Sequence, residues 1–260
     1  MDANKLQSIL ITGANRGLGL EMVKQLVESG SANCHVYAGC RDPDASKSKP
    51  LQELAKKHSK VITVVKLDVT NPTSVSDAAK KVGAHLEGGR LNLLVNNAGI
   101  LPRGTLQTTT EQDMQSSFDT NVMGPLRVIK EFLPYLCKAA KSCPQPGMSC
   151  SKAAVINIST LLGSITKIPE TYNFYPAFAY SISKASLNML NQCSVNEFQK
   201  EGIMFVVLHP GWVRTDMGGP EASADIDASE SVQGLLKVMR TLTEKQNGAF
   251  LDYKGNLLPW

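Results

Sequence analysis

Short apolar runs alternate with longer amphipathic segments along the whole chain. Several runs are apolar at consecutive positions, which is typical of strands that helices cover on both faces. They predict strands at Ser8–Thr12, Val36–Cys40, Val61–Leu67, Leu91–Val95, Ala153–Ile158, Met204–Leu208 and Ala249–Tyr253. The segments between them carry apolar residues at helical spacing. These predict helices at Leu18–Glu28, Ser74–Leu86, Asp113–Lys141, Ala179–Gln199 and Ser229–Thr243.

The alternation of strands and helices predicts an α/β fold with a doubly wound, mostly parallel seven-stranded sheet and helices on both faces, the Rossmann arrangement. The 260 residues suffice for one such domain, and no change of composition marks a linker. We therefore expect a single domain over residues 1–260. The least regular stretches are 42–50, 142–152, 164–176 and 217–228, and long loops of this kind are often functional.

Composition and charge exclude several other classes of protein. Hydrophobic residues make up 42% and charged residues 19%, as in ordinary globular domains. The net charge of +4 is mild and the basic residues form no run, so we expect no nucleic-acid partner. No apolar run approaches the roughly 18 residues of a membrane span, and residues 1–5 leave no room for a signal peptide.

The six cysteines indicate a reducing compartment. They form no C-x-x-C pair and have no spacing with histidine that is typical of a metal site. Most of them lie within apolar segments, which favours buried, reduced thiols. We therefore expect a cytoplasmic protein without a metal.

A glycine-rich turn, T-G-A-N-R-G-L-G at residues 12–19, connects the first strand to the first helix. Glycines let the backbone turn sharply and approach a diphosphate, whose charge the amides at a helix N-terminus stabilise. The alternative is a tight connection without a ligand. Its place at the first strand-turn-helix favours a dinucleotide, with contacts expected from Gly13, Asn15, Arg16, Gly17, Leu18 and Gly19.

Two arginines favour NADP(H) over NAD(H). An NAD site usually has an acidic residue after the second strand, whereas an arginine there accommodates a 2′-phosphate. Here the sequence has Cys40 and then Arg41, with Arg16 as a second cation in the glycine-rich turn. Two guanidinium groups would bind one phosphate strongly. The alternative is that both arginines are solvated surface residues.

Small and polar residues follow the third and fourth predicted strands, where open α/β sheets bind ligands. Asp68, followed by Val69, could accept a hydrogen bond from an adenine amine. After the fourth strand, Asn97, Ala98 and Gly99 leave room for the cofactor. Taken singly, each group could be ordinary turn chemistry.

Tyr180 and Lys184 form the expected reactive pair. Residues four apart project from the same face of a helix. A phenol has a pKa of about 10, which is too high for efficient proton exchange near neutrality, and a neighbouring ammonium would lower it. Alone, such a pair is often just a surface contact. Here it follows the fifth strand of a chain that already has a dinucleotide turn.

Two further side chains are expected to assist Tyr180. The fifth strand ends in Ser159 and Thr160, and a hydroxyl there could donate a hydrogen bond to the substrate oxygen. Asn121 lies within the predicted helix at Asp113–Lys141 and could hold a water molecule that links Lys184 to solvent. The alternative for Asn121 is an ordinary polar residue at a helix irregularity.

With these motifs assembled, the chain resembles the short-chain dehydrogenase/reductase family over nearly its whole length, and within it the sniffer-type carbonyl reductases and C-factor-like proteins. The motifs are T-G-x-x-x-G-x-G at 12–19, N-N-A-G at 96–99, Asn121, Ser159/Thr160, Y-x-x-x-K at 180–184 and the segment from Pro210 to Gly219. The resemblance implies further cofactor contacts from Pro210, Gly211, Val213 and Thr215, in addition to Tyr180 and Lys184.

The resemblance also implies substrate loops at about 164–178 and 212–228. It places the usual catalytic serine at Thr160, with Ser159 as the fallback. Tyr172, Phe174, Tyr175 and Phe178 would then form an aromatic wall beside the substrate, or else cover the core or a subunit interface. Family members often form dimers or tetramers, which leaves a homodimer open.

These features together predict NADPH-dependent reduction of small-molecule carbonyl compounds such as aldehydes, ketones and quinones. Tyr180 would deliver the proton, Thr160 would polarise the carbonyl, and Lys184 and Asn121 would support proton transfer. Two alternatives remain. One is an NADP(H)-binding redox-sensing or signalling module without important turnover, and the other is an alcohol or steroid dehydrogenase.

Overall fold

The computed structural model describes residues 7–29, 34–144, 146–218 and 226–260. A seven-stranded sheet in the order β3-β2-β1-β4-β5-β6-β7 lies at its centre, and all neighbouring strands are parallel. The predicted α/β fold is therefore confirmed, and each strand begins and ends within two residues of the prediction. The strands are β1 (Ser8–Thr12), β2 (His35–Cys40), β3 (Ile62–Lys66), β4 (Leu93–Asn96), β5 (Ala154–Ile158), β6 (Met204–His209) and β7 (Phe250–Asp252).

Helices connect successive strands and cover both faces of the sheet. They are α1 (Gly17–Glu28), α2 (Lys49–Lys57), α3 (Pro72–His85), α4 (Glu111–Phe118), α5 (Gly124–Ser142), α6 (Ile168–Thr171), α7 (Phe178–Phe198) and α8 (Ala228–Thr241). A π-helical turn, Asp119–Met123, joins α4 to α5. Short 3₁₀ turns lie at Ser46–Ser48, Glu87–Gly89, Leu161–Gly163, Gln199–Glu201 and Glu244–Gln246.

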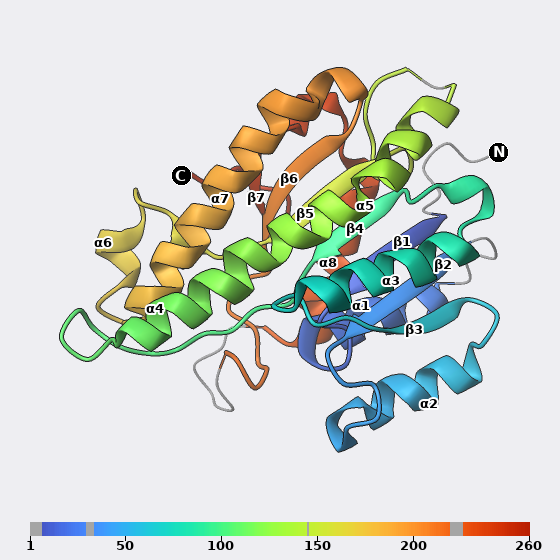
Figure 1. Cartoon of the computed structure of the whole chain (residues 1–260). Helices are drawn as coiled ribbons and strands as arrows, with labels where there is room; N and C mark the ends of the chain where they lie inside the picture. Colours follow the sequence, from blue (N-terminus) through green and yellow to red (C-terminus); the bar gives the residue numbers. More distant parts are fainter. Residues whose placement is uncertain (1–6, 30–33, 145, 219–225) are drawn as a thin grey trace.

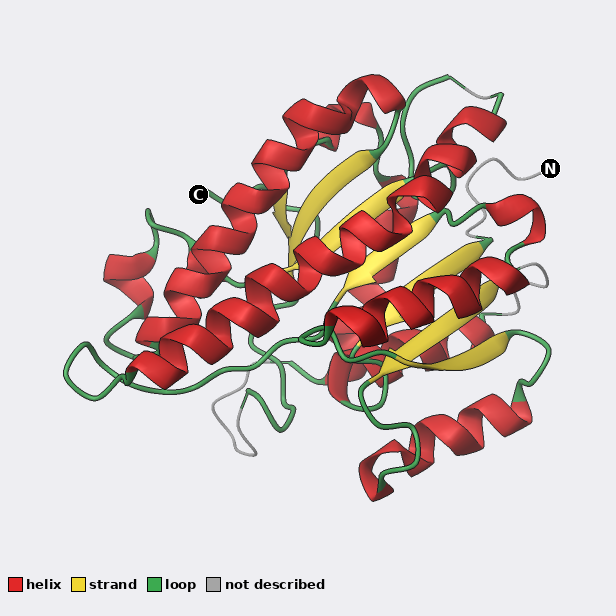
Figure 2. Ribbon diagram, viewed as in Figure 1, coloured by secondary structure: helices red, strands yellow, loops and turns green. Residues whose placement is uncertain are grey.

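The sheet separates two hydrophobic layers. Helices α3, α4, α5 and α7 lie in front of the sheet in Figure 1, and α1 and α8 lie behind it; the strands run between the two sets of helices in Figure 2. Side chains alternate across each strand, so that Ile9 and Ile11 belong to the layer of α1 and α8, whereas Leu10 belongs to that of α3 and α5. This two-sided burial explains why the strands are apolar at consecutive positions.

Three local predictions need correction. Helix α2 was not predicted; it begins at the end of the stretch 42–50, and its apolar residues Leu51, Leu54 and Ala55 lie at helical spacing against the core. Helix α6 lies within the predicted loop 164–176. The single helix expected at Asp113–Lys141 is divided by the π-helical turn. These elements are short or continuous with a neighbour, which apolar periodicity does not resolve.

The strand order fixes where a ligand can bind. The chain runs outward from β1 through β2 to β3 and then returns to β4 on the other side of β1. Connections after β1 and β4 therefore leave in opposite directions, and open α/β sheets bind ligands at such a switch point. Among the described residues, no helix is long and apolar enough to cross a membrane.

Candidate active site

The residues that follow β1 and β4 are joined directly at this switch point. Thr12 Oγ1 accepts hydrogen bonds from the amides of Asn97 and Ala98, both at 3.0 Å. The Asn97 side chain in turn donates to the carbonyls of Thr12 (2.9 Å) and Gly13 (3.1 Å). The predicted motifs at 12–19 and 96–99 are thus one structure, in which Asn97 stabilises the glycine-rich turn.

Two positions of this turn require glycine, one because of its backbone conformation and one because of close packing. Gly13 has a φ of +64°, in the left-handed region. A Cβ at Gly19 would lie 2.3 Å from the Gly13 carbonyl and 2.6 Å from Asn97 Nδ2. The first turn of α1 therefore packs against its own loop, which leaves the helix N-terminus close to any diphosphate bound there.

Gly19→Ala is expected to destabilise the fold by about 1–3 kcal/mol, because the added methyl meets backbone rather than a movable side chain. Denaturant unfolding would measure the change. Lys24→Ala, on the exposed face of the same helix, is the matched control and should change the free energy of unfolding by less than about 0.5 kcal/mol. Equal effects of the two substitutions would contradict the packing argument.

Arg16 and Arg41 flank a small polar connection between the glycine-rich turn and the end of β2. The Asn15 side chain donates to Ser48 Oγ at 3.2 Å, and Ser48 Oγ donates to the Asp42 carbonyl at 2.7 Å. Both arginines are exposed. Arg16 pairs with Asp216 at 3.0 Å, whereas no ion pair of Arg41 is found among the described residues. Arg16 follows Asn15 and Arg41 precedes Asp42, so each arginine adjoins one end of this connection in the sequence.

Asp68 and Val69 follow β3. Asp68 Oδ1 accepts hydrogen bonds from the amide (3.0 Å) and hydroxyl (2.7 Å) of Thr70, so part of its capacity is used in a turn. Val69 is buried, and it packs beside Gly124 at the start of α5. The second carboxylate oxygen of Asp68 has no hydrogen bond within the described residues and would be available to an adenine amine.

Tyr180 and Lys184 lie on one face of α7, as their spacing predicts. Both side chains are buried. The Lys184 ammonium lies 5.7 Å from the centre of the Tyr180 ring and donates to the Ile158 carbonyl at 2.8 Å. Lys184 is thus held against the end of β5, immediately before the candidate hydroxyls of Ser159 and Thr160.

Burial shifts the pKa values of this pair toward their neutral forms. Burial raises the pKa of Tyr180 well above that of a free phenol, and a charge on Tyr175 would raise it further. Burial lowers the pKa of Lys184 to about 8. We expected the ammonium, together with oxidised nicotinamide, to lower the Tyr180 pKa; in the protein without the cofactor, burial raises it instead. A protonated phenol is nevertheless the state that a proton donor needs.

Asn121 lies in the π-helical turn between α4 and α5 and is fully buried. Its Oδ1 accepts from the Ile100 amide at 3.0 Å, and its Nδ2 donates to the Ile100 carbonyl (3.0 Å) and to Ser183 Oγ (2.9 Å). A Cβ placed on Gly99 would lie 3.1 Å from Asn121 Oδ1 and 3.7 Å from Lys184 Nζ. The helix irregularity therefore brings Asn121 next to Lys184. π-Turns are frequent at functional sites.

Ser159 and Thr160 have different surroundings. The Ser159 hydroxyl is buried and has no hydrogen-bond partner in the part of the chain that the structure describes. Thr160 is half-buried, and its hydroxyl accepts a hydrogen bond from the Leu162 amide at 3.3 Å. The hydroxyl proton of Thr160 is therefore still available for donation. This is compatible with the prediction that Thr160 polarises a substrate, which stays a prediction.

The segment after β6 passes over the glycine-rich turn. The Pro210 carbonyl accepts from Ser231 Oγ at 2.6 Å, and Gly211 has a φ of +84°. Val213 is buried, and the Thr215 methyl lies 3.7 Å from a Cβ placed on Gly17. This contact brings the predicted cofactor residues of the two segments together. The expected loop at 212–228 falls partly outside the described residues, from 219 to 225.

The four aromatic residues before Tyr180 do not form one wall. Tyr172 and Phe178 line a cavity of about 450 Å³ between α6 and α7, together with Ser181 and Ile182. Phe174 is 84% exposed. Tyr175 alone packs beside the segment after β6, with its ring 6.0 Å from that of Trp212 in an edge-to-face arrangement. Tyr175 thus contacts Trp212, and the expectation that these aromatic residues border the substrate stays a prediction.

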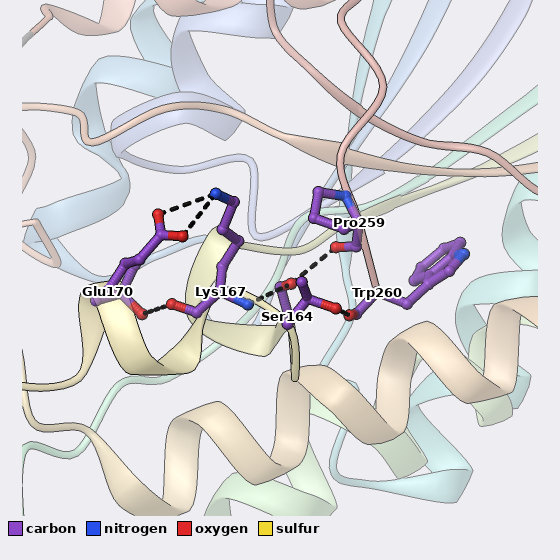
Figure 3. Close-up of polar contacts among 7 residues, drawn as sticks. Ser164, Lys167, Glu170, Pro259 and Trp260 are labelled. Carbon is purple, nitrogen blue, oxygen red and sulfur yellow. Dashed lines mark hydrogen bonds and ion pairs between the residues drawn. The ribbon is translucent and has the colours of Figure 1, made fainter.

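The C-terminal residues pack on the core and on the α6 segment. The Trp260 ring stacks on Phe250 at 5.2 Å. In Figure 3 the Pro259 carbonyl accepts from Ser164 Oγ at 2.8 Å, and the Trp260 ring points away from Ser164. Thr166 donates to the Trp260 carbonyl through its amide and its hydroxyl. The segment leading to α6 is thus anchored to β7.

Sequence reasoning missed two residues of this site and one contact beside it. Thr12 joins the two cofactor motifs, and Ser183 connects Asn121 to the carbonyl of Tyr180. Arg103 contacts Tyr175. Thr12 was present in the motif as its first letter, and Ser183 lies next to Lys184. Arg103 follows no periodic pattern and gave no signal.

Comparison with known proteins identifies the family. The model of the family described as short chain dehydrogenase matches residues 7–225. The chain belongs to this family. The predicted resemblance to short-chain dehydrogenases/reductases is confirmed, and the chain is therefore an oxidoreductase by family.

Solved carbonyl reductases share this structure over nearly its full length. The NADPH-bound carbonyl reductase from chicken fatty liver is 45% identical, with a TM-score of 0.93 over 98% of this chain and 100% of its own. The carbonyl reductase Sniffer of D. melanogaster is 37% identical, with a TM-score of 0.91 over the same shares.

C-signal of Myxococcus xanthus, a relative by sequence, is 36% identical over 66% of this chain and 94% of its own length. This short-chain dehydrogenase/reductase thus resembles sniffer-type proteins, as its sequence predicts.

Proposed function

We propose that this protein is an NADPH-dependent carbonyl reductase. The observation that carries the proposal is the convergence of Tyr180, Lys184 and Asn121 at the sheet edge where the glycine-rich turn begins α1. The similar chicken carbonyl reductase is described as NADPH-bound, and the similar fly protein as a carbonyl reductase. Both descriptions support the same chemistry for this site.

The residues present fit a dinucleotide phosphate. Gly19 lets the first turn of α1 pack against the Gly13 carbonyl, which keeps the helix N-terminus close to a bound diphosphate, and Arg16 and Arg41 are exposed cations. Asp68 and Asn97 to Gly99 would border the adenosine half, and Pro210, Gly211, Val213 and Thr215 would cover the nicotinamide half. Lys184 and Tyr180 would hold the nicotinamide ribose. When bound, NADPH supplies the hydride that the carbonyl carbon accepts.

The protein's own residues handle the proton. Tyr180 keeps its proton in the buried site and would deliver it from the phenol oxygen to the carbonyl oxygen. Thr160 would donate a hydrogen bond to that oxygen and stabilise the negative charge that develops on it, with Ser159 as the alternative. Lys184 and Asn121 would return a proton to Tyr180 from solvent through a water molecule. The product is the corresponding alcohol.

Oxidation of NADPH by the purified protein tests this proposal. The substrate panel contains quinones, aldehydes and ketones, and each assay is repeated with NADH. Turnover with a marked preference for NADPH supports a reductase. Tight NADPH binding without turnover would favour the second hypothesis, a binding module, for which the similarity to C-signal is the specific observation. Faster oxidation of alcohols or steroids with NADP⁺ would favour a dehydrogenase.

We also propose a homodimer in a reducing compartment, such as the cytoplasm. Ile182 and Met189 on α7 and Phe118 on α4 are exposed apolar side chains, and α4 contacts α7. A second copy would cover them. No disulfide bond is found among the described residues, as a reducing compartment would require. Sedimentation equilibrium should give twice the chain mass, and a monomer at all concentrations would contradict the dimer.

A further inference from the structure

The chain after Gly99 runs from the reactive residues to an arginine that the proposed mechanism does not use. Gly99 lies beside Asn121 and Lys184. Four residues later, Arg103 precedes Gly104, whose amide donates to the Pro176 carbonyl at 3.1 Å and whose carbonyl accepts from the Phe178 amide at 2.9 Å. This pairing places Arg103, the residue before Gly104, beside the start of α7, the helix that carries Tyr180.

Tyr175 joins Arg103 to the segment that leads into α7, the helix of Tyr180. The Arg103 Nε donates to the Tyr175 hydroxyl at 2.9 Å, and the guanidinium carbon lies 4.6 Å from the centre of the Tyr175 ring. Trp212 packs edge-to-face against Tyr175 from the segment after β6. Arg103 and Tyr175 therefore lie together beside the start of α7, the helix that carries Tyr180.

The guanidinium of Arg103 has unused donors. Its Nε is occupied by Tyr175, but neither terminal nitrogen has a hydrogen bond or ion pair with any described residue, and the side chain is exposed. Stacking on Tyr175 fixes the plane of the guanidinium. A planar fork with two free nitrogens matches a carboxylate in a bidentate arrangement.

We propose that Arg103 selects carbonyl substrates that carry a carboxylate about one aromatic ring away from the carbonyl group. The inference rests on the proposed function, because Tyr180 must donate its proton to the carbonyl oxygen. Tyr175 and Trp212 would contact the ring between the two groups, and Arg103 would bind the carboxylate. Neutral carbonyl compounds would react at the same site without this anchor.

Two substrates that differ in one charge test the proposal. 4-Carboxybenzaldehyde carries the carboxylate opposite the aldehyde, and its methyl ester is neutral. We expect wild-type kcat/KM to be about tenfold higher for the acid, as for a hydrogen-bonded charge pair near solvent. Arg103→Met should remove that advantage and leave the ester unchanged. The advantage should also shrink at high ionic strength.

Control variants separate recognition from structure. Arg240→Met removes an exposed charge from α8, on the other side of the sheet, and should preserve the preference for the acid. Tyr175→Phe keeps the ring but loses the hydroxyl. If Arg103→Met slows both substrates equally and Tyr175→Phe does the same, Arg103 acts by holding Tyr175 and the proposal is wrong.

A binding measurement keeps this test independent of turnover. The dissociation constants of the acid and the ester are measured by quenching of tryptophan fluorescence, since Trp212 lies beside the site. If the acid binds more tightly than the ester and Arg103→Met abolishes this difference, the anion site is supported even when neither compound is reduced. Only the proposed function would then fail. If both compounds are reduced and their dissociation constants are equal, the anion site is wrong but the proposed reductase function is supported.

Discussion

Tyr180→Phe is expected to lower kcat for carbonyl reduction by about 10³-fold, because general acid catalysis contributes roughly 10²–10⁴-fold. The substitution removes one oxygen from a buried site and preserves the ring that packs beside Lys184. Since burial raises the pKa of Tyr180, the wild-type phenol is protonated at neutral pH and ready to donate. Single-turnover oxidation of NADPH in the presence of excess aldehyde measures the loss.

The binding of NADPH should change by no more than about twofold in the same variant, because most proposed cofactor contacts come from other segments. Tyr135→Phe is the matched control: it also removes a phenol oxygen, which donates to the Ala79 carbonyl on α3, away from the site. That variant should retain wild-type kcat. Wild-type turnover by Tyr180→Phe would show that another group supplies the proton.

The fold could be predicted from the sequence because burial on both faces leaves a strong local signal. Residues such as Val36 to Cys40 are apolar in succession since helices cover both sides of their strand. Helix α2 was missed because it is short and mostly polar, although its few apolar residues lie at helical spacing. Apolar spacing does not locate the π-helical turn, since it remains helical on either side, but the irregularity considered at Asn121 is present.

The candidate site was predictable where chemistry lies within motifs and unpredictable where it depends on packing between segments. Tyr180 and Lys184 share a face because of their spacing alone. The raised pKa of Tyr180 depends on how deeply the folded chain buries it, which spacing does not reveal. Arg103 and Tyr175 are 72 residues apart, and only the pairing of Gly104 with Pro176 and Phe178 brings them together.

Replacing both Arg16 and Arg41 by glutamine is expected to raise the KM for NADPH by about 100-fold and to leave the KM for NADH nearly unchanged. Each hydrogen-bonded charge pair with the 2′-phosphate would contribute about tenfold. Steady-state kinetics with the two cofactors at fixed substrate measures the change. Equal changes with both cofactors would show that these arginines do not contact the 2′-phosphate.

Substitution of Asp216 gives a second test of the contact between Arg16 and the 2′-phosphate, with the opposite expected effect on NADPH binding. Its 3.0 Å ion pair with Arg16 is exposed at both ends and contributes little to stability. The pair does occupy one guanidinium nitrogen, so a 2′-phosphate must compete with the carboxylate for Arg16. Asp216→Asn should therefore tighten NADPH binding about two- to threefold without affecting NADH, an effect that weakens at high ionic strength. Arg240→Gln, which removes a distant exposed charge, should change neither cofactor. Tighter binding in the first variant alone would mean that Arg16 exchanges one anion for another when the phosphorylated cofactor binds.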